Sequence, residues 1–209
     1  MSKDSVKADL TDSKDLAQSV TTSPKTMRME FLIDTKDVLN SNSMPSQWFL
    51  KSKMSKNLRE LGRQVGLKAH SNPEFANQML EHAKSLKNTN TIKARTHKQM
   101  RKAGKSEEQI EKAVLEAEKD YPVKPKPEGA FFEFDEFTVN VLVCPPTKRR
   151  IDPPNLYPTV KNLLDGCVTD VGIAPDDDFK HIKRFSFEYG GLSGEKGKYR
   201  IILEFEEVA

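Results

Sequence analysis

The segment 148–181 constrains this chain more than any other, because a rigid turn, a helical pattern and an acidic run follow one another within it. Pro153 and Pro154 fix the backbone directly after Asp152 and restrict where its carboxylate can point. Apolar residues then recur at helical spacing over 156–168, which predicts an amphipathic helix. The residues predicted to face inward are Val160, Leu163, Leu164 and Cys167.

The polar side of this helix carries Lys161 and Asp165, which are four residues apart and therefore share a face. Asn155 is predicted to cap the N-terminus of the helix. Because Asp152 comes just before the helix, this face can look toward the Asp152 carboxylate. Taken singly, these residues also have simpler explanations: a turn residue for Asp152 and a weak surface ion pair for Lys161 and Asp165.

An acidic run, Asp176, Asp177 and Asp178, follows the helix. Adjacent carboxylates repel one another, so such a run is unfavourable unless a cation compensates it. Mg²⁺ prefers oxygen ligands and usually takes one or two carboxylates together with substrate phosphate. With Asp152 and the neighbouring cations, the run therefore indicates a metal site that acts on a phosphodiester. A solvated turn and a capping site are the alternatives.

The charge of the chain is unevenly distributed, although the formal net charge is only +3. Residues 51–105 contain 14 Lys or Arg against 3 Glu, whereas residues 106–143 contain 10 acids against 4 Lys. Such a division indicates a polyanion-binding surface and a separate helix that is solvated or faces a partner. Basic side chains that are simply solvated are the alternative explanation.

The remaining pattern predicts an α+β fold, with a small mixed sheet packed against helices. Strands are expected over 29–33, 131–143, 181–189 and 198–208, with a bulge near Glu136 and a hairpin connection between the last two. A helix is expected over 55–69. Its apolar face would consist of Leu58, Leu61 and Val65, and its polar face of Lys56, Arg59, Arg63 and Lys68.

Residues 71–128 are predicted to be a helical insertion in a domain that spans 26–209. Capping-box patterns begin at Ser71 and Ser106, and a basic helix is expected over 91–103. The proline-rich segment 123–129 ends the helical part. Residues 1–25 are polar with few large apolar side chains, and we expect them to be disordered.

Several protein classes are disfavoured by the composition. The chain has no apolar run long enough to span a bilayer and no signal-peptide pattern, so we expect a cytoplasmic protein without a membrane partner. Cys144 and Cys167 cannot form a disulfide framework and are predicted to be small buried hydrophobic residues. The four histidines are scattered, which argues against a zinc site.

Residues 131–208 resemble the RusA-like Holliday junction resolvases, endodeoxyribonucleases carried largely by phages and prophages. The similarity lies in the basic residues before Asp152, the D-x-x-N element 152–155, the K-x-x-x-D helix 161–165 and the PDDD run 175–178. It is weaker over 29–70 and does not include 1–25 or 71–128. Pro154 stands where the family has the second aspartate of its D-x-D-N motif.

The resemblance implies a homodimer, in the cytoplasm of a bacterial host, that resolves four-way DNA junctions by paired nicks during recombination and repair. It implies catalytic roles for Asp152, Lys161 and Asp177, with Mg²⁺, or Mn²⁺ in its place, as cofactor. The expected metal ligands are Asp152, Asp165, Asp176, Asp177 and Asp178. The expected DNA-binding residues are Lys51, Lys53, Lys56, Lys148, Arg149 and Arg150, which would contact phosphates without reading sequence.

A non-catalytic accessory protein that binds branched DNA is the alternative. Pro154 favours it, because a proline side chain cannot bind a metal. Lys161 and the acidic run oppose it, since simple DNA binding does not require a repulsive acidic cluster. With either activity, the 71–128 insertion is a candidate contact site for a protein partner.

Overall fold

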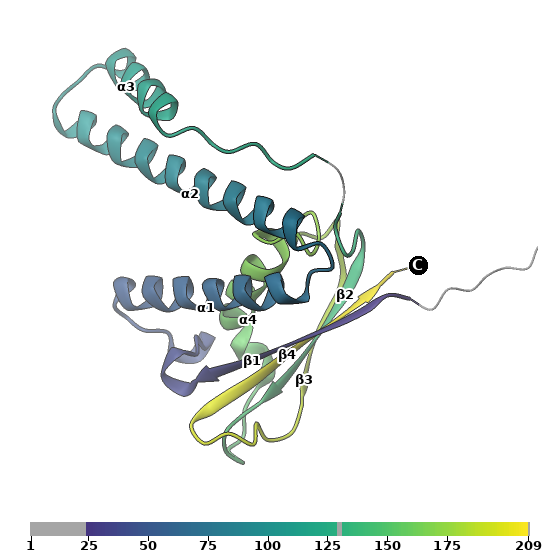
Figure 1. Ribbon diagram of the computed structural model, residues 1–209. Helices are drawn as coiled ribbons and strands as arrows, with labels where there is room; N and C mark the ends of the chain where they lie inside the picture. The colour runs from purple at the N-terminus through teal and green to yellow at the C-terminus, as the bar shows by residue number, and fades with distance from the viewer. Residues whose placement is uncertain (1–23, 129–130, 209) are drawn as a thin grey trace, which may run out of the picture.

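The computed structural model describes residues 24–128 and 131–208, and it has the predicted α+β fold (Figure 1). The prediction of disorder over 1–25 falls almost entirely outside these residues. The strands are β1 (Thr26–Asp34), β2 (Phe137–Cys144), β3 (Ile182–Tyr189) and β4 (Lys198–Glu207). The helices are α1 (Trp48–Ala69), α2 (Pro73–Lys102), α3 (Glu107–Asp120) and α4 (Tyr157–Leu164).

The four strands form one mixed sheet in the order β1-β4-β2-β3. β4 is antiparallel to both β1 and β2, whereas β2 and β3 are parallel. The hairpin predicted between the last two strands is therefore wrong, since β3 and β4 are separated by β2. Parallel neighbours require a crossover connection, and α4 lies within the one that joins β2 to β3. The chain then returns along β4 through the middle of the sheet.

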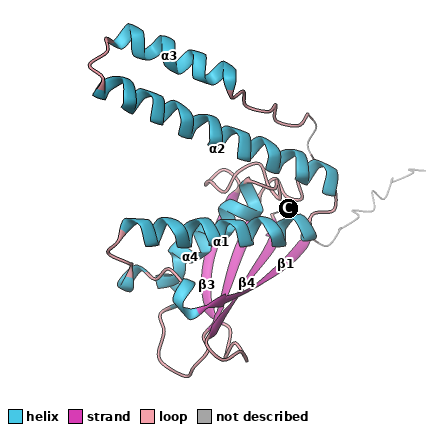
Figure 2. Ribbon diagram, turned by 60° about the vertical axis from the view of Figure 1, so that its left-hand side comes forward, coloured by secondary structure: helices cyan, strands magenta, loops and turns pink. Residues whose placement is uncertain are grey.

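The hydrophobic core lies between one face of the sheet and the helices α1 and α4 (Figure 2). Alternate residues of the antiparallel strands point into it, as expected for a sheet with one covered face. Those that the strands contribute include Met29, Phe31, Ile33, Val139, Val141, Val143, Ile201, Leu203 and Phe205. Cys144 and Cys167 are free and buried, as predicted.

The predicted start of β2 is wrong. Residues 131–136, expected to belong to that strand, precede it as an irregular segment. The backbone N–H groups of Glu133 and Phe134 both donate to the carbonyl of Ile173, at 2.9 and 3.0 Å, so they take no part in a strand ladder. The predicted irregularity near Glu136 is present as a register shift between Phe137 and Thr138 against β3.

α4 is shorter than the predicted helix 156–168. A 3-10 turn, Pro153–Leu156, precedes it, and one wider turn of π-helix, Asp165–Thr169, follows it. The predicted cap at Asn155 is wrong, because Asn155 lies inside the 3-10 turn and its amide donates to Asp152 Oδ2 at 3.2 Å. The predicted inward side is confirmed, since the four apolar residues expected there are all buried.

Glycines allow α1 to lie directly against α4 and the π turn. A Cβ atom at Gly62 would overlap the carbonyl oxygen of Leu163, and one at Gly166 would overlap that of Arg59. α1 begins at Trp48, earlier than the predicted residue 55. The close approach of backbone to backbone brings polar residues of α1 beside those that follow α4.

The inserted segment forms the hairpin of α2 and α3, which projects away from the sheet (Figure 1). α2 is one continuous helix of 30 residues, so the division into an apolar helix and a separate basic helix at 91–103 is wrong. Asn72 caps it in place of Ser71, because Asn72 Oδ1 accepts a hydrogen bond from Phe75 N at 3.0 Å.

The second inserted helix begins at the predicted capping box. In the capping box of α3, Ser106 Oγ accepts a hydrogen bond from Gln109 N and the Gln109 side chain accepts one from Ser106 N. Residues 123–128 form no helix or strand, in agreement with their proline content. Within 24–128 and 131–208, none of the helices has the length and apolar character needed to cross a membrane.

Candidate active site

The polar face of α4 and the acidic run meet at Lys161. Its Nζ lies 2.6 Å from Asp165 Oδ1, one helical turn along the chain. The same ammonium forms an ion pair with Asp177 Oδ2, from the loop before β3. Two carboxylates that are separate in sequence therefore share one cation, at a site that is half-buried rather than fully exposed.

The other two acids of the run stabilise the backbone of their own loop. Asp176 Oδ1 accepts a hydrogen bond from the N–H of Asp177 at 2.8 Å. Asp178 Oδ1 accepts one from the N–H of Lys180 at 2.9 Å. Asp177 is thus the member of the run that turns to Lys161, in line with the residue chosen from the sequence.

Burial and charge oppose each other in this cluster. Burial raises the pKa of Asp177, and the nearby Asp165 and Asp176 carboxylates add to the rise, while Lys161 lowers it without cancelling the effect. Burial disfavours the ammonium form of Lys161, but the hydrogen bonds to Asp165 and Asp177 outweigh it and raise its pKa. Lys161 is therefore held in its charged form beside an acid of raised pKa.

Two arginines of α1 extend the cluster, and the sequence reasoning did not identify their role. Arg59 Nη1 lies 3.3 Å from Asp165 Oδ2, and Arg59 also binds Asp170 through Nε and Nη2, both at 2.6 Å. Arg63 Nε donates to Asp170 Oδ2 at 2.8 Å. Arg63, predicted on the polar face of the helix, is buried, and its side chain contacts this carboxylate.

No sequence signal pointed to Asp170, which is a lone acid in an apolar stretch. Its side chain is 2% exposed, and the two guanidinium groups supply the hydrogen bonds that a buried carboxylate requires. The hydrogen bond to Asp170 is also the main cause of the raised pKa of Arg59. The sequence shows that Arg59 and Arg63 share one helix face, but it does not show that Asp170 is their partner.

Asp152 lies in a different hollow from Lys161. It lines a pocket of about 800 Å³ together with Arg149, Arg150 and Asn155. The same segment also contributes Pro146, Thr147 and Ile151. The rest of the lining comes from the segment after β1, with Thr35, Asn40, Asn42 and Ser43, and from Gly197 and Tyr199 at the start of β4. Two of the three predicted basic residues of 148–150 thus flank Asp152, but none of Lys161, Asp165 and Asp177 lines this pocket.

The five predicted metal ligands do not form one group. Within the described ranges 24–128 and 131–208, no three His, Cys, Asp or Glu side chains are placed to hold a metal ion together. Asp165 and Asp177 do converge, and a pair of carboxylates completed by substrate phosphate is a usual donor set for Mg²⁺. The donor chemistry of this pair fits the ion, whereas Asp152, Asp176 and Asp178 do not join it here.

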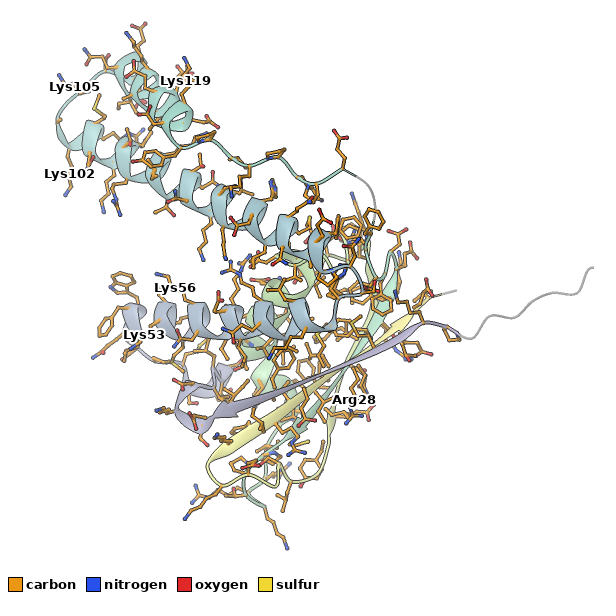
Figure 3. The ribbon with its side chains drawn as sticks, viewed as in Figure 1. Arg28, Lys53, Lys56, Lys102, Lys105 and Lys119 are labelled. Atoms are coloured by element: carbon orange, nitrogen blue, oxygen red, sulfur yellow. The ribbon has the colours of Figure 1, made fainter. Side chains whose placement is uncertain are left out.

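The predicted DNA-binding lysines of α1 lie at its exposed N-terminal end. Lys53 and Lys56, labelled in Figure 3, line a shallow hollow with Trp48 and Phe49. The Trp48 side chain is largely exposed, and the adjacent Phe49 is exposed as well. Lys51 is exposed on the same helix, and Lys148 is exposed before the Asp152 pocket.

Comparison with protein-family models, with curated proteins and with solved structures gave no match for this chain.

Proposed function

We propose that this protein is a Mg²⁺-dependent endodeoxyribonuclease that cuts branched DNA, with the four-way junction as its principal substrate. The observation that carries the proposal is the ammonium of Lys161 held between Asp165 and Asp177. Such a group offers a cation that can neutralise a phosphodiester and two carboxylates that can hold Mg²⁺. Homodimerisation, a cytoplasmic location and a role in recombination and repair belong to the same proposal and come from the resemblance.

The roles of the residues follow from their charges. Lys161 would neutralise negative charge that develops on the scissile phosphate. Asp165 and Asp177 are the pair that would hold Mg²⁺, or Mn²⁺ in its place. When bound, such an ion polarises phosphate oxygens and lowers the pKa of a water ligand. Arg59 would keep the Asp165 carboxylate oriented, since it is held in turn by the buried Asp170.

Asp152 and its arginines would bind DNA next to this cluster. Arg149, Arg150 and Asp152 line the same pocket. Guanidinium groups bind phosphate through paired hydrogen bonds, which suits them to a strand on either side of a branch point. A catalytic role for Asp152 requires the pocket and the Lys161 cluster to act on one phosphate.

A second candidate is a protein that binds branched DNA without cutting it. The observation in its favour is the separation of Asp152 from Lys161, Asp165 and Asp177, together with the lack of a three-ligand group in the part of the chain that the structure describes. Pro154 in place of a motif aspartate points the same way. The two candidates differ in chemistry but share a DNA-binding surface.

Cleavage of an end-labelled synthetic four-way junction, with Mg²⁺ and separately with Mn²⁺, tests the proposal. We expect paired, symmetric nicks from the wild type. Lys161→Ala and Asp177→Asn should each lower the single-turnover cleavage rate by about 10²-fold or more. Asp120→Asn, at the exposed end of α3, is the matched control for the loss of one acid and should cut like the wild type.

Binding is measured beside cleavage, by gel shift in Ca²⁺. Variants that bind but do not cut would support catalytic roles for Lys161 and Asp177. If the wild type binds the junction tightly and cuts it with neither metal, the non-catalytic candidate replaces the nuclease. If the wild type neither binds nor cuts any branched substrate, both candidates are wrong.

A further inference from the structure

The helix α2 has one side rich in cations and free of acids. Between Lys84 and Lys105 the chain contains eight Lys or Arg and no Asp or Glu. Two of these cations turn to α3: Lys93 pairs with Glu118 at 2.9 Å and Arg101 with Glu107 at 3.0 Å. Lys84 pairs with Glu81. Among the described residues, the other five cations of this segment form no salt bridge: Lys105 follows α2, and four lie on the helix, namely Lys87, Arg95, Lys98 and Lys102.

Helical spacing places these four cations together. They recur at intervals of eight, three and four residues, so they lie along one stripe. That stripe is opposite the side on which Ser85, Thr89 and Lys93 contact α3 and the segment that follows it. Near the start of α2, the side that carries the stripe also carries Ala76 and Leu80, which are buried. The stripe therefore faces α1.

α1 and α2 diverge from the short turn that joins them, and they open like a V in both views (Figures 1 and 2). α2 packs along α3, whereas it meets α1 mainly near the turn. In Figure 3, Lys56 lies on the side of α1 that is turned to α2, and Lys102 lies at the far end of α2. The open side of the V is thus bordered by cations from both helices.

Inside the V, the cations approach one another. Burial lowers the pKa of Lys87, and the nearby positive charges of Arg59, Arg63 and Lys56 lower it further. Arg59 is the same residue that binds Asp165 beside Lys161. The positive surface therefore begins at the candidate active site and continues outward along α2.

The outer side of the hairpin has the opposite charge. α3 exposes several acids there: Glu108, Glu111, Glu116 and Asp120. A polyanion is consequently attracted to the side of the hairpin that faces α1 and repelled from the other. This distribution of charge does not suit an acidic partner that binds α2 equally well from every side.

We propose that the facing sides of α1 and α2 bind the phosphate backbone of one duplex arm of a branched DNA and lead it to the Lys161 cluster. This inference rests on the proposed function and assigns the helical insertion to it. From Lys87 to Lys102 the stripe extends about 22 Å at 1.5 Å per residue. That length equals the axial rise of about six base pairs of duplex, at 3.4 Å of helix axis each. Such contacts hold the substrate without reading its sequence.

A pair of double variants tests the surface. Lys98→Ala with Lys102→Ala removes two charges from the stripe, and Lys112→Ala with Lys119→Ala removes two exposed charges from α3. Lys119 lies on the part of the hairpin remote from α1 (Figure 3). The dissociation constant for a four-way junction is measured in Ca²⁺ by fluorescence anisotropy over a series of salt concentrations. Circular dichroism and thermal unfolding check that both variants are folded.

The expected result is a change in salt dependence for one variant alone. Each lost phosphate contact lowers the slope of log K against log salt by about 0.9, so the α2 variant should lose about two units. The α3 variant should keep the wild-type slope. Cleavage by the α2 variant should recover when the salt concentration is lowered, because the Lys161 cluster is intact.

Three results would overturn the inference. Equal slopes for the wild type and the α2 variant mean that α2 does not contact DNA, and wild-type cleavage would then leave the proposed function in place. An equal loss of slope in both double variants means a general effect of net charge. A wild type that binds no DNA at any salt concentration removes the inference and the proposed function together.

Discussion

Arg59 donates from Nε and Nη2 to the two carboxylate oxygens of Asp170, at 2.6 Å each, across 111 residues of sequence. Arg63 adds a third hydrogen bond to the same carboxylate. The network ties the middle of α1 to the segment that follows α4, where backbone already meets backbone at Gly62 and Gly166. Arg59, which contacts Asp165, belongs to this network. The geometry of the candidate active site therefore depends on the packing of α1.

The first prediction concerns Asp170→Asn. The substitution leaves two guanidinium groups beside a neutral amide in a buried position, where an unpaired charge costs about 3–5 kcal/mol. We expect the free energy of unfolding, measured in urea, to fall by about 3 kcal/mol. Glu60→Gln removes the more exposed partner of Arg63 and should cost less than about 1 kcal/mol. Equal losses in the two variants would contradict a special role for Asp170.

The second prediction concerns the contact between α1 and the π turn. In Gly166→Ala the new Cβ meets the backbone of Arg59, Gly62 and Arg63, which cannot move without separating the helices. We expect a loss of at least about 3 kcal/mol in unfolding free energy, or an insoluble protein. Gly194→Ala is the comparison, since it has open space around it and a φ of 75°. Only the cost of the left-handed backbone, about 1 kcal/mol, is expected there.

The third prediction concerns Glu133, whose side chain is 2% exposed. Burial disfavours its ionised form, but hydrogen bonds from Lys25 and from the Ser71 N–H outweigh the burial, so its pKa is lowered from 4.5. A lowered pKa in the folded state stabilises the protein above pH 4.5, and this contribution is lost as the pH falls through the folded-state value. Glu133→Gln should therefore lose about 1–3 kcal/mol at pH 7.

The pH dependence provides the check for Glu133. The difference in melting temperature between the wild type and Glu133→Gln should be largest at neutral pH and should shrink as the solution is made acidic below 4.5. Glu136→Gln, which removes an exposed acid paired with Lys183, serves as the control and should change little. If the difference in melting temperature were the same at every pH, the loss of stability would come from the altered shape of the side chain and not from its lost charge.

The fourth prediction concerns the stability of Asp177→Asn in a chelator. The pKa of Asp177 is raised above 3.8, so its contribution to stability is present below that pH and is lost as the pH rises through the raised value. At pH 7 the ionised Asp177 carboxylate therefore opposes folding. The Asp177→Asn variant, with a neutral side chain, should melt at the same temperature as the wild type or higher. A gain of about 1 kcal/mol would appear as roughly 2–4 °C. A clearly lower melting temperature at pH 7 would contradict the arrangement around Lys161.

Part of the candidate site could be read from the sequence because it depends on local geometry. The spacing of Lys161 and Asp165 on one helix already implies that they meet, and the structure places them 2.6 Å apart. Repulsion within 176–178 implied a compensating cation, which is Lys161 for Asp177. The proposed junction-cutting activity goes beyond this geometry, and the cleavage experiment with Lys161→Ala and Asp177→Asn tests it.

Local sequence signals sufficed for the helical and strand periodicities, the capping box of α3, the inward side of α4 and the α+β class. The position of β4 between β1 and β2, the contacts of Arg59 and Arg63 with Asp170, and the location of Asp152 in another pocket from Lys161 follow from the folded arrangement alone. The physical reason is that periodicity depends on the few residues of one turn. Contacts between distant segments depend instead on which faces pack together, and here on glycines that let two backbones touch.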